Sequence, residues 1–322
     1  MEPAPVTTAP VLRRAQGRGL VLPAVLALIS LPAWLVLADA VSFHAANRSN
    51  GSLVVSGHRR EYLLHVPRSY DPARAAPLVI SLHGAGGWPV QQMEMSGWDR
   101  LADREGFVVV YPSASEGVGP RVWRVERGPG LARDVAFISA LIDTLAVTYH
   151  IDSTRIYANG ISNGGGMSFA LSCTLSHRIA AVGLVAAANT LPWSWCTDRR
   201  AVPMMAFHGT ADPMIPYDGG RSWIAPDVFP NVPGWARLWA RRNGCGPVPS
   251  ASQVAADVSR LAYTACAGGA DVVLYSVKGG GHSWPGGVAL PEWWVGRTTT
   301  GIDATAELWA FFRRHPLVGG GR

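Results

Sequence analysis

The chain has 322 residues, of which 48% are hydrophobic and 16% are charged, a composition typical of a globular protein with a sizeable core. Its formal net charge at pH 7 is +6, but Lys278 is the single lysine among 28 basic residues and the arginines are scattered. No basic stripe alternates with aromatic residues, which argues against a nucleic-acid partner and leaves an ordinary basic surface.

The first 40 residues have the pattern of a secretory signal. Arginines at 13, 14 and 18 precede an apolar run over 20–37, which ends in the small-x-small sequence of 38–40. That run is also long enough to be an uncleaved membrane anchor, but its two prolines favour cleavage. We therefore expect an extracellular protein with one domain over 41–322, and attachment to a membrane only if the segment is uncleaved.

Strands and helices alternate along the rest of the chain. Apolar or alternating segments predict strands at 61–70, 76–82, 106–114, 154–160, 179–187, 202–209 and 271–279. Helices are predicted at 97–105, 135–149, 163–176 and 303–315. This alternation predicts a mainly parallel sheet with helices on both faces, while the stretch from 217 to 260 reads as irregular.

Ser162 lies in the sequence Gly-Ile-Ser-Asn-Gly, between a predicted strand and a predicted helix. A nucleophile elbow needs this setting, because a tight turn lifts the serine hydroxyl above the sheet and Gly160 and Gly164 relieve crowding. The alternative is a serine that only caps the helix. The strand–turn–helix context favours a nucleophile.

A serine nucleophile needs a base and an acid that orients it, in the chain order Ser, Asp or Glu, His for this type of site. Asp212 follows the buried strand at 202–209, and His282 lies in a Gly-rich loop after the strand at 271–279. Both should therefore reach the carboxyl edge of the sheet beside Ser162. The rival acids and histidines, which fit these positions less well, are Asp198, Asp218, Asp227, His177, His208 and His315.

The oxyanion that forms on an attacked ester needs backbone N–H donors. The Gly-rich loop at 82–87 follows a predicted strand, so we expect the amides of Ala85 and Asn163 to serve as donors. The loop lacks the Lys-Ser/Thr of a phosphate-binding P-loop, and paired histidines at metal spacing are absent from the sequence. No metal or other cofactor is expected.

Four cysteines remain after the signal: Cys173, Cys196, Cys245 and Cys266. An even number in an exported chain suggests two disulfides, with three possible connectivities. Pairing of sequence neighbours, 173 with 196 and 245 with 266, is the simplest of the three. Each such bond closes a loop of about 20 residues, which stabilises the fold by roughly 3 kcal/mol in the loop-entropy description.

Six motifs together resemble the polyhydroxybutyrate depolymerase family of secreted esterases, which adjoins the feruloyl and acetylxylan esterases of carbohydrate esterase family one. They are SLHGAGG, REGFVVVYP, GISNGGGMSFALSC, HGTADPMIPYDGG, GGGHSWPGG and IDATAELWAFF. They occur in the expected order and span nearly all of 41–322. The resemblance implies an α/β-hydrolase fold, a catalytic triad of Ser162, Asp212 and His282, and the local cysteine pairing. The alanine of HGAGG departs from many members of that family but changes no backbone donor.

The sequence therefore predicts a secreted serine carboxylic-ester hydrolase that acts on a small or oligomeric ester. A serine peptidase or an acyl transferase of the same fold is the alternative, and a non-catalytic binding protein would normally lack one triad member. Trp284 is the candidate for substrate binding among 13 tryptophans, which can stack on sugars or aromatic acyl groups. No separate polymer-binding module fits beside the predicted domain, so we expect soluble esters to be better substrates than crystalline polyester.

Overall fold

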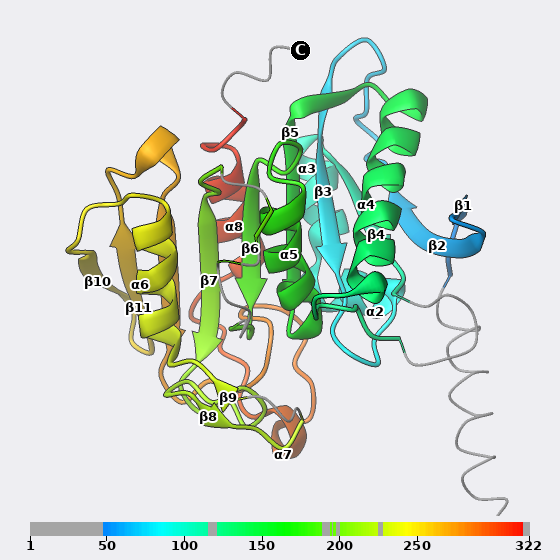
Figure 1. The fold of residues 1–322 in the computed structure, drawn as a ribbon. Coiled ribbons are helices and arrows are strands. Elements are labelled where there is room, and N and C mark those ends of the chain that lie inside the picture. The colour runs from blue at the N-terminus through cyan, green and yellow to red at the C-terminus, as the bar shows by residue number, and fades with distance from the viewer. Residues whose placement is uncertain are drawn as a thin grey trace, which may run out of the picture. The chain divides into compact units, whose positions relative to one another are not determined.

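A mixed β-sheet is at the centre of the structure, which is a computed structural model (Figure 1). The residues that it describes are 48–114, 121–188, 194, 196–197, 200–224 and 228–317. The strands of this sheet are β1 (Gly51–Val55), β2 (His58–His65), β3 (Ala76–Leu82), β4 (Val108–Pro112), β5 (Ile151–Ile161), β6 (Ala181–Val185), β7 (Met204–Gly209), β10 (Ser250–Ala255), β11 (Val258–Tyr263) and β12 (Val272–Val277). Their order across the sheet is β1-β2-β4-β3-β5-β6-β7-β12-β11-β10. The predicted signal at 1–40 lies outside the described residues.

The middle of the sheet is parallel, and its edges are antiparallel. Strands β4, β3, β5, β6, β7 and β12 pair in parallel, whereas β1, β2, β10 and β11 pair with antiparallel neighbours. Every residue of β3, β4, β6, β7 and β12 is buried, as expected for parallel strands that are covered on both faces. The predicted fold class, a mainly parallel sheet of the α/β-hydrolase type, is confirmed.

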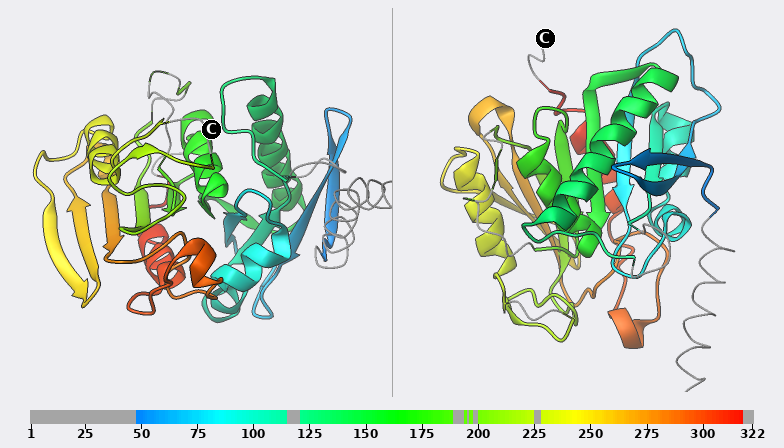
Figure 2. Two further views of the ribbon diagram at one scale, coloured as in Figure 1. Left: turned by 90° about the horizontal axis from the view of Figure 1, so that it is seen from below. Right: turned by 45° about the vertical axis from the view of Figure 1, so that its right-hand side comes forward.

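Helices cover both faces of the sheet. Those of the described residues are α2 (Pro89–Ser96), α3 (Trp98–Glu105), α4 (Pro129–Thr148), α5 (Asn163–Thr174), α6 (Val232–Arg242), α7 (Glu292–Val295) and α8 (Ala304–Phe312). Seen from below in the left panel of Figure 2, α4, α5 and α6 lie on one face, and α3 and α8 lie on the other. Alternate residues of β3 divide between these layers: Leu78, Ile80 and Leu82 pack with the α4–α6 core, and Val79 packs with the α3–α8 core.

The stretch from 217 to 260 is more regular than its sequence indicates. It contains a two-stranded sheet of β8 (Gly220–Arg221) and β9 (Val228–Phe229), the whole of α6, and the edge strand β10. Helix α6 has an apolar face, with Trp235 and Trp239 buried, and Asn231 Oδ1 caps its start by accepting from the Gly234 N–H at 2.9 Å. The prediction of an irregular segment was therefore wrong, because short elements rich in proline and arginine give weak periodicity.

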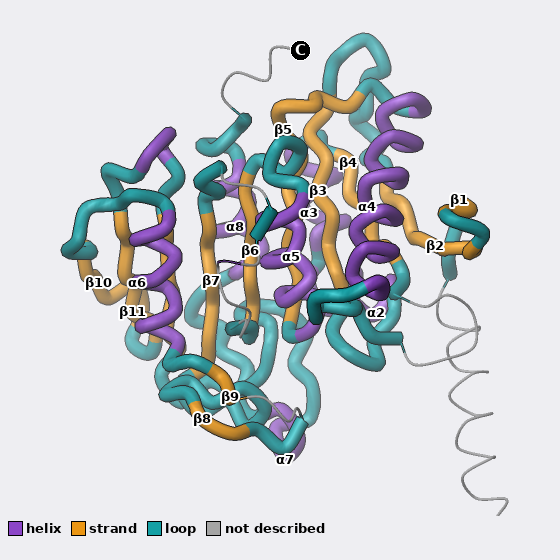
Figure 3. The backbone as a smooth tube through the Cα atoms, viewed as in Figure 1, coloured by secondary structure: helices purple, strands orange, loops and turns teal. Residues whose placement is uncertain are grey.

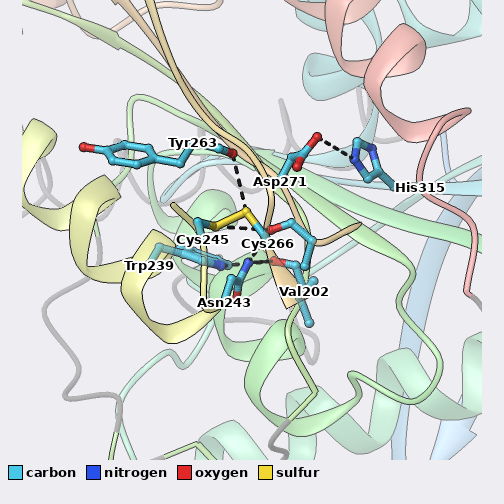
Figure 4. The surroundings of a disulfide bond; sticks show 9 residues. Val202, Trp239, Asn243, Cys245, Tyr263, Cys266, Asp271 and His315 are labelled. Atoms are coloured by element: carbon cyan, nitrogen blue, oxygen red, sulfur yellow. Dashed lines mark hydrogen bonds and ion pairs between the residues drawn. A yellow bond between two sulfur atoms is a disulfide. The ribbon is translucent and has the colours of Figure 1, made fainter. Parts of the chain in front are cut away.

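Two disulfides join Cys173 to Cys196 and Cys245 to Cys266, which are the pairs of sequence neighbours. The second bond lies beside the last turn of α6, where Asn243 Nδ2 donates to Val202 O and to Ala270 O, each at 2.8 Å (Figure 4). These contacts attach α6 to the segments that lead into β7 and β12. The two strands carry Asp212 and His282 on the loops that follow them.

The carboxyl ends of the parallel strands lead into loops that gather at one end of the sheet, around β8, β9 and α7 (Figure 3). This is the end at which ligands bind in open α/β sheets. Among the described residues, no helix is both long and apolar enough to span a membrane.

Candidate active site

Ser162 lies on a strained turn between β5, which ends at Ile161, and α5, which begins at Asn163. Its φ of 53° and ψ of −123° place a non-glycine residue in a sparsely populated region of backbone space. A Cβ on Gly164 would overlap the carbonyl oxygen of Leu82, so only glycine allows this close approach to β3. Strain of this kind is maintained where it exposes a functional side chain, and Ser162 lines a large cavity.

Asp212 and His282 form a hydrogen-bonded pair, with His282 Nδ1 2.8 Å from Asp212 Oδ2. Because the carboxylate accepts, Nδ1 carries the proton and Nε2 is left as the basic nitrogen. The Asp212 side chain is fully buried, and its Oδ1 accepts from the N–H groups of Met214 and Ile215 at 2.8 and 2.9 Å. His282 lines the same cavity as Ser162, and Asp212 is hydrogen-bonded to it, so the three residues predicted for the triad are associated with one cavity.

The hydrogen bonds of Asp212 keep it ionised. Burial by itself raises the pKa of this carboxyl, but the hydrogen bond from His282, its charge when protonated, and the Ile215 N–H together lower the pKa below its ordinary value. A carboxylate that stays charged orients the imidazole and stabilises the imidazolium that forms when His282 takes a proton.

His208 is a buried neighbour of this pair. Its Nε2 donates to Ile215 O at 2.9 Å and lies 3.4 Å from Asp212 Oδ2, and it does not line the cavity. Burial lowers its pKa, so it is neutral at pH 7 and supports the loop that carries Asp212. Among the rival acids, Asp218 is exposed, whereas Asp198 and Asp227 lie outside the described residues.

The loop that carries His282 is held by a neighbouring segment. His282 N–H donates to Val295 O, and Gly281 N–H donates to Arg297 O at 2.8 Å. A Cβ on Gly281 would overlap Val295 O, so the glycine lets the two backbones approach closely. The Gly-rich sequence around His282 therefore forms a loop whose conformation is fixed by these backbone contacts.

The two predicted oxyanion donors are Ala85 in the Gly-rich loop and Asn163 at the first position of α5. Ala85 and Asn163 both line the cavity, and a Cβ placed on Gly84 would lie 3.6 Å from the Cβ of Ser162. Their N–H groups can therefore face the position of a carbonyl oxygen attacked by Ser162. Both residues line the cavity beside Ser162, and their role as oxyanion donors stays a prediction.

The cavity has a volume of about 1300 Å³, larger than a single small ligand needs. Aromatic and aliphatic side chains line it, together with Arg124, Glu126 and Arg127 from the segment before α4. Trp223 and Trp294 line its mouth with exposed fractions of 70% and 49%.

The structure does not bring Trp284 to this cavity. It is 1% exposed, and its Nε1 donates to Thr305 Oγ1 at 2.9 Å in the core near α8. Trp284 therefore supports the His282 loop from behind, and Trp123, Trp223 and Trp294 are the tryptophans that line the cavity. The sequence could not separate these tryptophans, because none of them lies in a segment whose periodicity predicts which side chains are buried.

Sequence reasoning also missed the segment of residues 121–125, which we call the strap. It crosses beside the Gly-rich loop and contributes Trp123 and Arg124 to the cavity lining. Asp134, in the second turn of α4, accepts from the Arg124 N–H at 2.8 Å and pairs with the buried Arg60 at 2.9 Å. The sequence RVWRV, with two arginines around one tryptophan, was the only feature that could have indicated a role for this segment at the site, and it predicts no structure by itself.

Comparison of the sequence with known proteins shows the family to which this chain belongs. Residues 61–209 match the family model described as esterase PHB depolymerase. The chain is 30% identical over 229 residues to a probable feruloyl esterase C from Aspergillus flavus, an alignment that covers 67% of this chain and 77% of that protein. This chain belongs to the esterase PHB depolymerase family.

Another member of this group of relatives is feruloyl esterase B from Piromyces equi, which is 31% identical over 230 residues. The alignment covers 70% of this chain but 42% of the Piromyces protein, so the chain spans less than half of that relative. An acetyl xylan esterase from Aspergillus awamori has the same fold, with a TM-score of 0.51 at 18% identity over 74% of this chain and 91% of that one. Within the described ranges, no group of three or more His, Cys, Asp or Glu side chains is arranged to hold a metal ion.

Proposed function

We propose that this protein is a serine carboxylic-ester hydrolase that works through an acyl-enzyme. The observation that carries the proposal is the 2.8 Å hydrogen bond between His282 Nδ1 and Asp212 Oδ2, at a cavity that the strained Ser162 also lines. Membership of a family of esterases supports the choice of an ester as substrate.

In the first half-reaction, Ser162 Oγ attacks the ester carbonyl carbon while His282 Nε2 takes the hydroxyl proton. The carbonyl oxygen becomes an oxyanion, which the N–H groups of Ala85 and Asn163 stabilise. When the tetrahedral intermediate collapses, the ester C–O bond breaks and His282 gives its proton to the leaving alkoxide. An alcohol departs, and the acyl group stays on Ser162.

In the second half-reaction, His282 takes a proton from water, and the resulting hydroxide attacks the carbonyl carbon of the acyl group on Ser162. The carboxylic acid is released when the bond to Ser162 Oγ breaks and His282 returns the proton to Oγ. Asp212 stays ionised throughout and holds the imidazole in the tautomer that both steps need.

The substrate class follows from the cavity and the relatives together. Relatives are named for feruloyl and acetylxylan esters, and the family model is named for a polyester. The exposed Trp223 and Trp294 at the mouth favour an ester with a ring-shaped or apolar portion that extends beyond the reacting carbonyl. We place the protein outside the cytoplasm, because two disulfides and the apolar N-terminal segment with its small-x-small end both fit an exported chain.

The test is hydrolysis of aryl, feruloyl, acetyl-xylan and 3-hydroxybutyrate esters by the parent and by Ser162→Ala. We expect turnover by the parent and a loss of several orders of magnitude in the variant, which should still fold. A fluorophosphonate should label the parent at Ser162 and leave the variant unlabelled. Turnover by Ser162→Ala within tenfold of the parent would refute the proposed nucleophile, and faster cleavage of peptides than of esters would refute the proposed reaction.

A further inference from the structure

The peptide unit between Gly84 and Ala85 carries one of the proposed oxyanion donors, because its N–H group is that of Ala85. Its carbonyl oxygen, Gly84 O, lies 2.7 Å from His83 Nδ1 and accepts from the Gly87 N–H at 3.0 Å. In a trans peptide the C=O and N–H bonds point in opposite directions. Donors that hold the oxygen on one side therefore direct the Ala85 N–H to the other side, and Ala85 lines the cavity.

His83 can make this contact in one tautomer only. Its Nε2 accepts from the Ala114 N–H at 3.1 Å, so the proton must be on Nδ1, which donates to Gly84 O. The imidazole is 1% exposed, and burial lowers the pKa of His83 to about 4, with the charges of Arg121 and Arg60 adding to this and the Gly84 bond opposing it. At neutral pH the ring is therefore uncharged and fixed between two backbone groups.

Arg121 of the strap holds the far end of the same loop. Its guanidinium donates to Gly86 O at 3.0 Å and to Gly87 O at 3.2 Å, and its own carbonyl oxygen accepts from the Gly86 N–H at 2.9 Å. The side chain is 8% exposed, so these charge-assisted hydrogen bonds form in a largely water-free place. The loop is therefore held at both of its ends.

Trp123 of the strap connects this loop to the other oxyanion donor. Its indole N–H donates to His83 O at 3.1 Å, while Asn163 binds its backbone N–H and C=O. The strap thus joins the Gly-rich loop to the first residue of α5, two segments far apart in the sequence. Both proposed donors of the oxyanion hole are attached to it.

We propose that His83 is a positioning residue that sets the oxyanion hole by fixing the Gly84–Ala85 peptide, and that the strap holds His83 and its loop in this orientation. His83 does not line the cavity, so it acts through the peptide and not on the substrate. The inference rests on the proposed ester hydrolysis at Ser162. It adds a reason why a buried, neutral histidine lies within the Gly-rich loop, directly before Gly84.

The test compares His83→Leu, His83→Asn and Arg121→Met with the parent, using p-nitrophenyl butyrate as substrate and phenylboronic acid as a probe of tetrahedral adducts. Loss of one oxyanion donor costs on the order of 10²- to 10³-fold in kcat. We expect about a 10²-fold lower kcat for His83→Leu, with KM within threefold of the parent and a parallel loss of boronate affinity. His83→Asn keeps a donor near the position of Nδ1, so its kcat should stay within tenfold of the parent. Arg121→Met leaves His83 in place and should lower kcat with the same unchanged KM.

His315→Leu is the matched control, because His315 is also buried (9% exposed) and its Nδ1 also contacts a carbonyl, Phe311 O at 2.8 Å, but its partners are Phe311 and Asp271 and not the Gly-rich loop. It should keep the parent kcat. A folded His83→Leu or Arg121→Met with the parent kcat would overturn the inference, and so would equal losses in His83→Leu and His83→Asn. If the parent itself neither hydrolyses the ester nor takes up a fluorophosphonate, the proposed function fails instead.

Discussion

Asn163 binds the backbone of Trp123 through both ends of its side-chain amide. Its Oδ1 accepts from the Trp123 N–H at 2.7 Å, and its Nδ2 donates to Trp123 O at 3.0 Å. The residue that follows the proposed nucleophile therefore has two separate tasks. Its main-chain N–H is a proposed oxyanion donor, and its side chain fixes the strap.

This relationship predicts different effects for the side chain and the backbone of Asn163. Asn163→Ala keeps the main-chain donor but leaves the N–H and C=O of Trp123 unpaired, which should destabilise the fold by about 2 kcal/mol. We expect kcat to fall by roughly tenfold, because the strap is loosened while the proposed donor remains. Urea unfolding and steady-state kinetics on one preparation measure both effects, and an unchanged unfolding free energy would contradict the bidentate contact.

The backbone strain at Ser162 predicts that Ser162→Gly is more stable than Ser162→Ala. Its φ of 53° is strained for any residue with a Cβ, at a cost of about 1–3 kcal/mol, and glycine avoids this cost. Ser162→Gly should therefore unfold at a higher urea concentration than Ser162→Ala, by about 1 kcal/mol in free energy, although both are inactive. Equal midpoints for the two variants would show that the turn is not under strain.

The choice of acid can be tested by two amide substitutions. Asp212→Asn removes the charge that orients His282, so kcat should fall about 10³- to 10⁴-fold while the fold persists. Asp218→Asn is the matched control on the same loop, because Asp218 is exposed, and it should stay within threefold of the parent. A larger loss in Asp218→Asn than in Asp212→Asn would reassign the acid.

The lowered pKa of His83 predicts that the free energy of unfolding depends on pH. Its pKa is lowered from 6.5 to about 4 in the folded protein, so the unfolded chain binds a proton at pH values where the folded protein does not. Stability is therefore lost as the pH falls from about 6.5 toward 4, by roughly 3 kcal/mol, and the loss levels off below that range. Urea unfolding at pH 7, 5.5 and 4 should show this decrease in the parent and a smaller one in His83→Asn. Parallel pH curves for the two proteins would argue against a buried neutral His83.

Trp223 predicts a contribution to substrate binding. Its ring is 70% exposed, but its Nε1 donates to Pro213 O at 3.0 Å, beside Asp212, so the ring is held in place at the mouth of the cavity. Trp223→Ala should raise KM several-fold for feruloyl esters and leave KM for a small acetate ester unchanged, since only the larger ester reaches the mouth. Trp293→Ala is a control, because Trp293 is 87% exposed and does not line the cavity. Equal effects on both esters would show that Trp223 only supports the loop.

The sequence by itself predicted the parallel sheet, the elbow at Ser162 and the positions of Asp212 and His282 at strand ends. It could do so because buried strands give unbroken apolar runs, and because a strained turn needs Gly160 and Gly164 in fixed places. The chain order of these residues along a parallel sheet then places their loops at one edge.

Only the tertiary structure decided which side chains surround the site. Trp284 was predicted to bind substrate but is buried behind the His282 loop, whereas Trp223 and Trp294 are at the mouth. Arg121 donates to two carbonyls of the Gly-rich loop, and His83 Nε2 accepts from the Ala114 N–H, contacts between residues 31 to 35 positions apart in the chain. Contacts of a side chain with a distant backbone leave no periodic pattern, since any donor of suitable length can make them and only the folded chain brings the partners together.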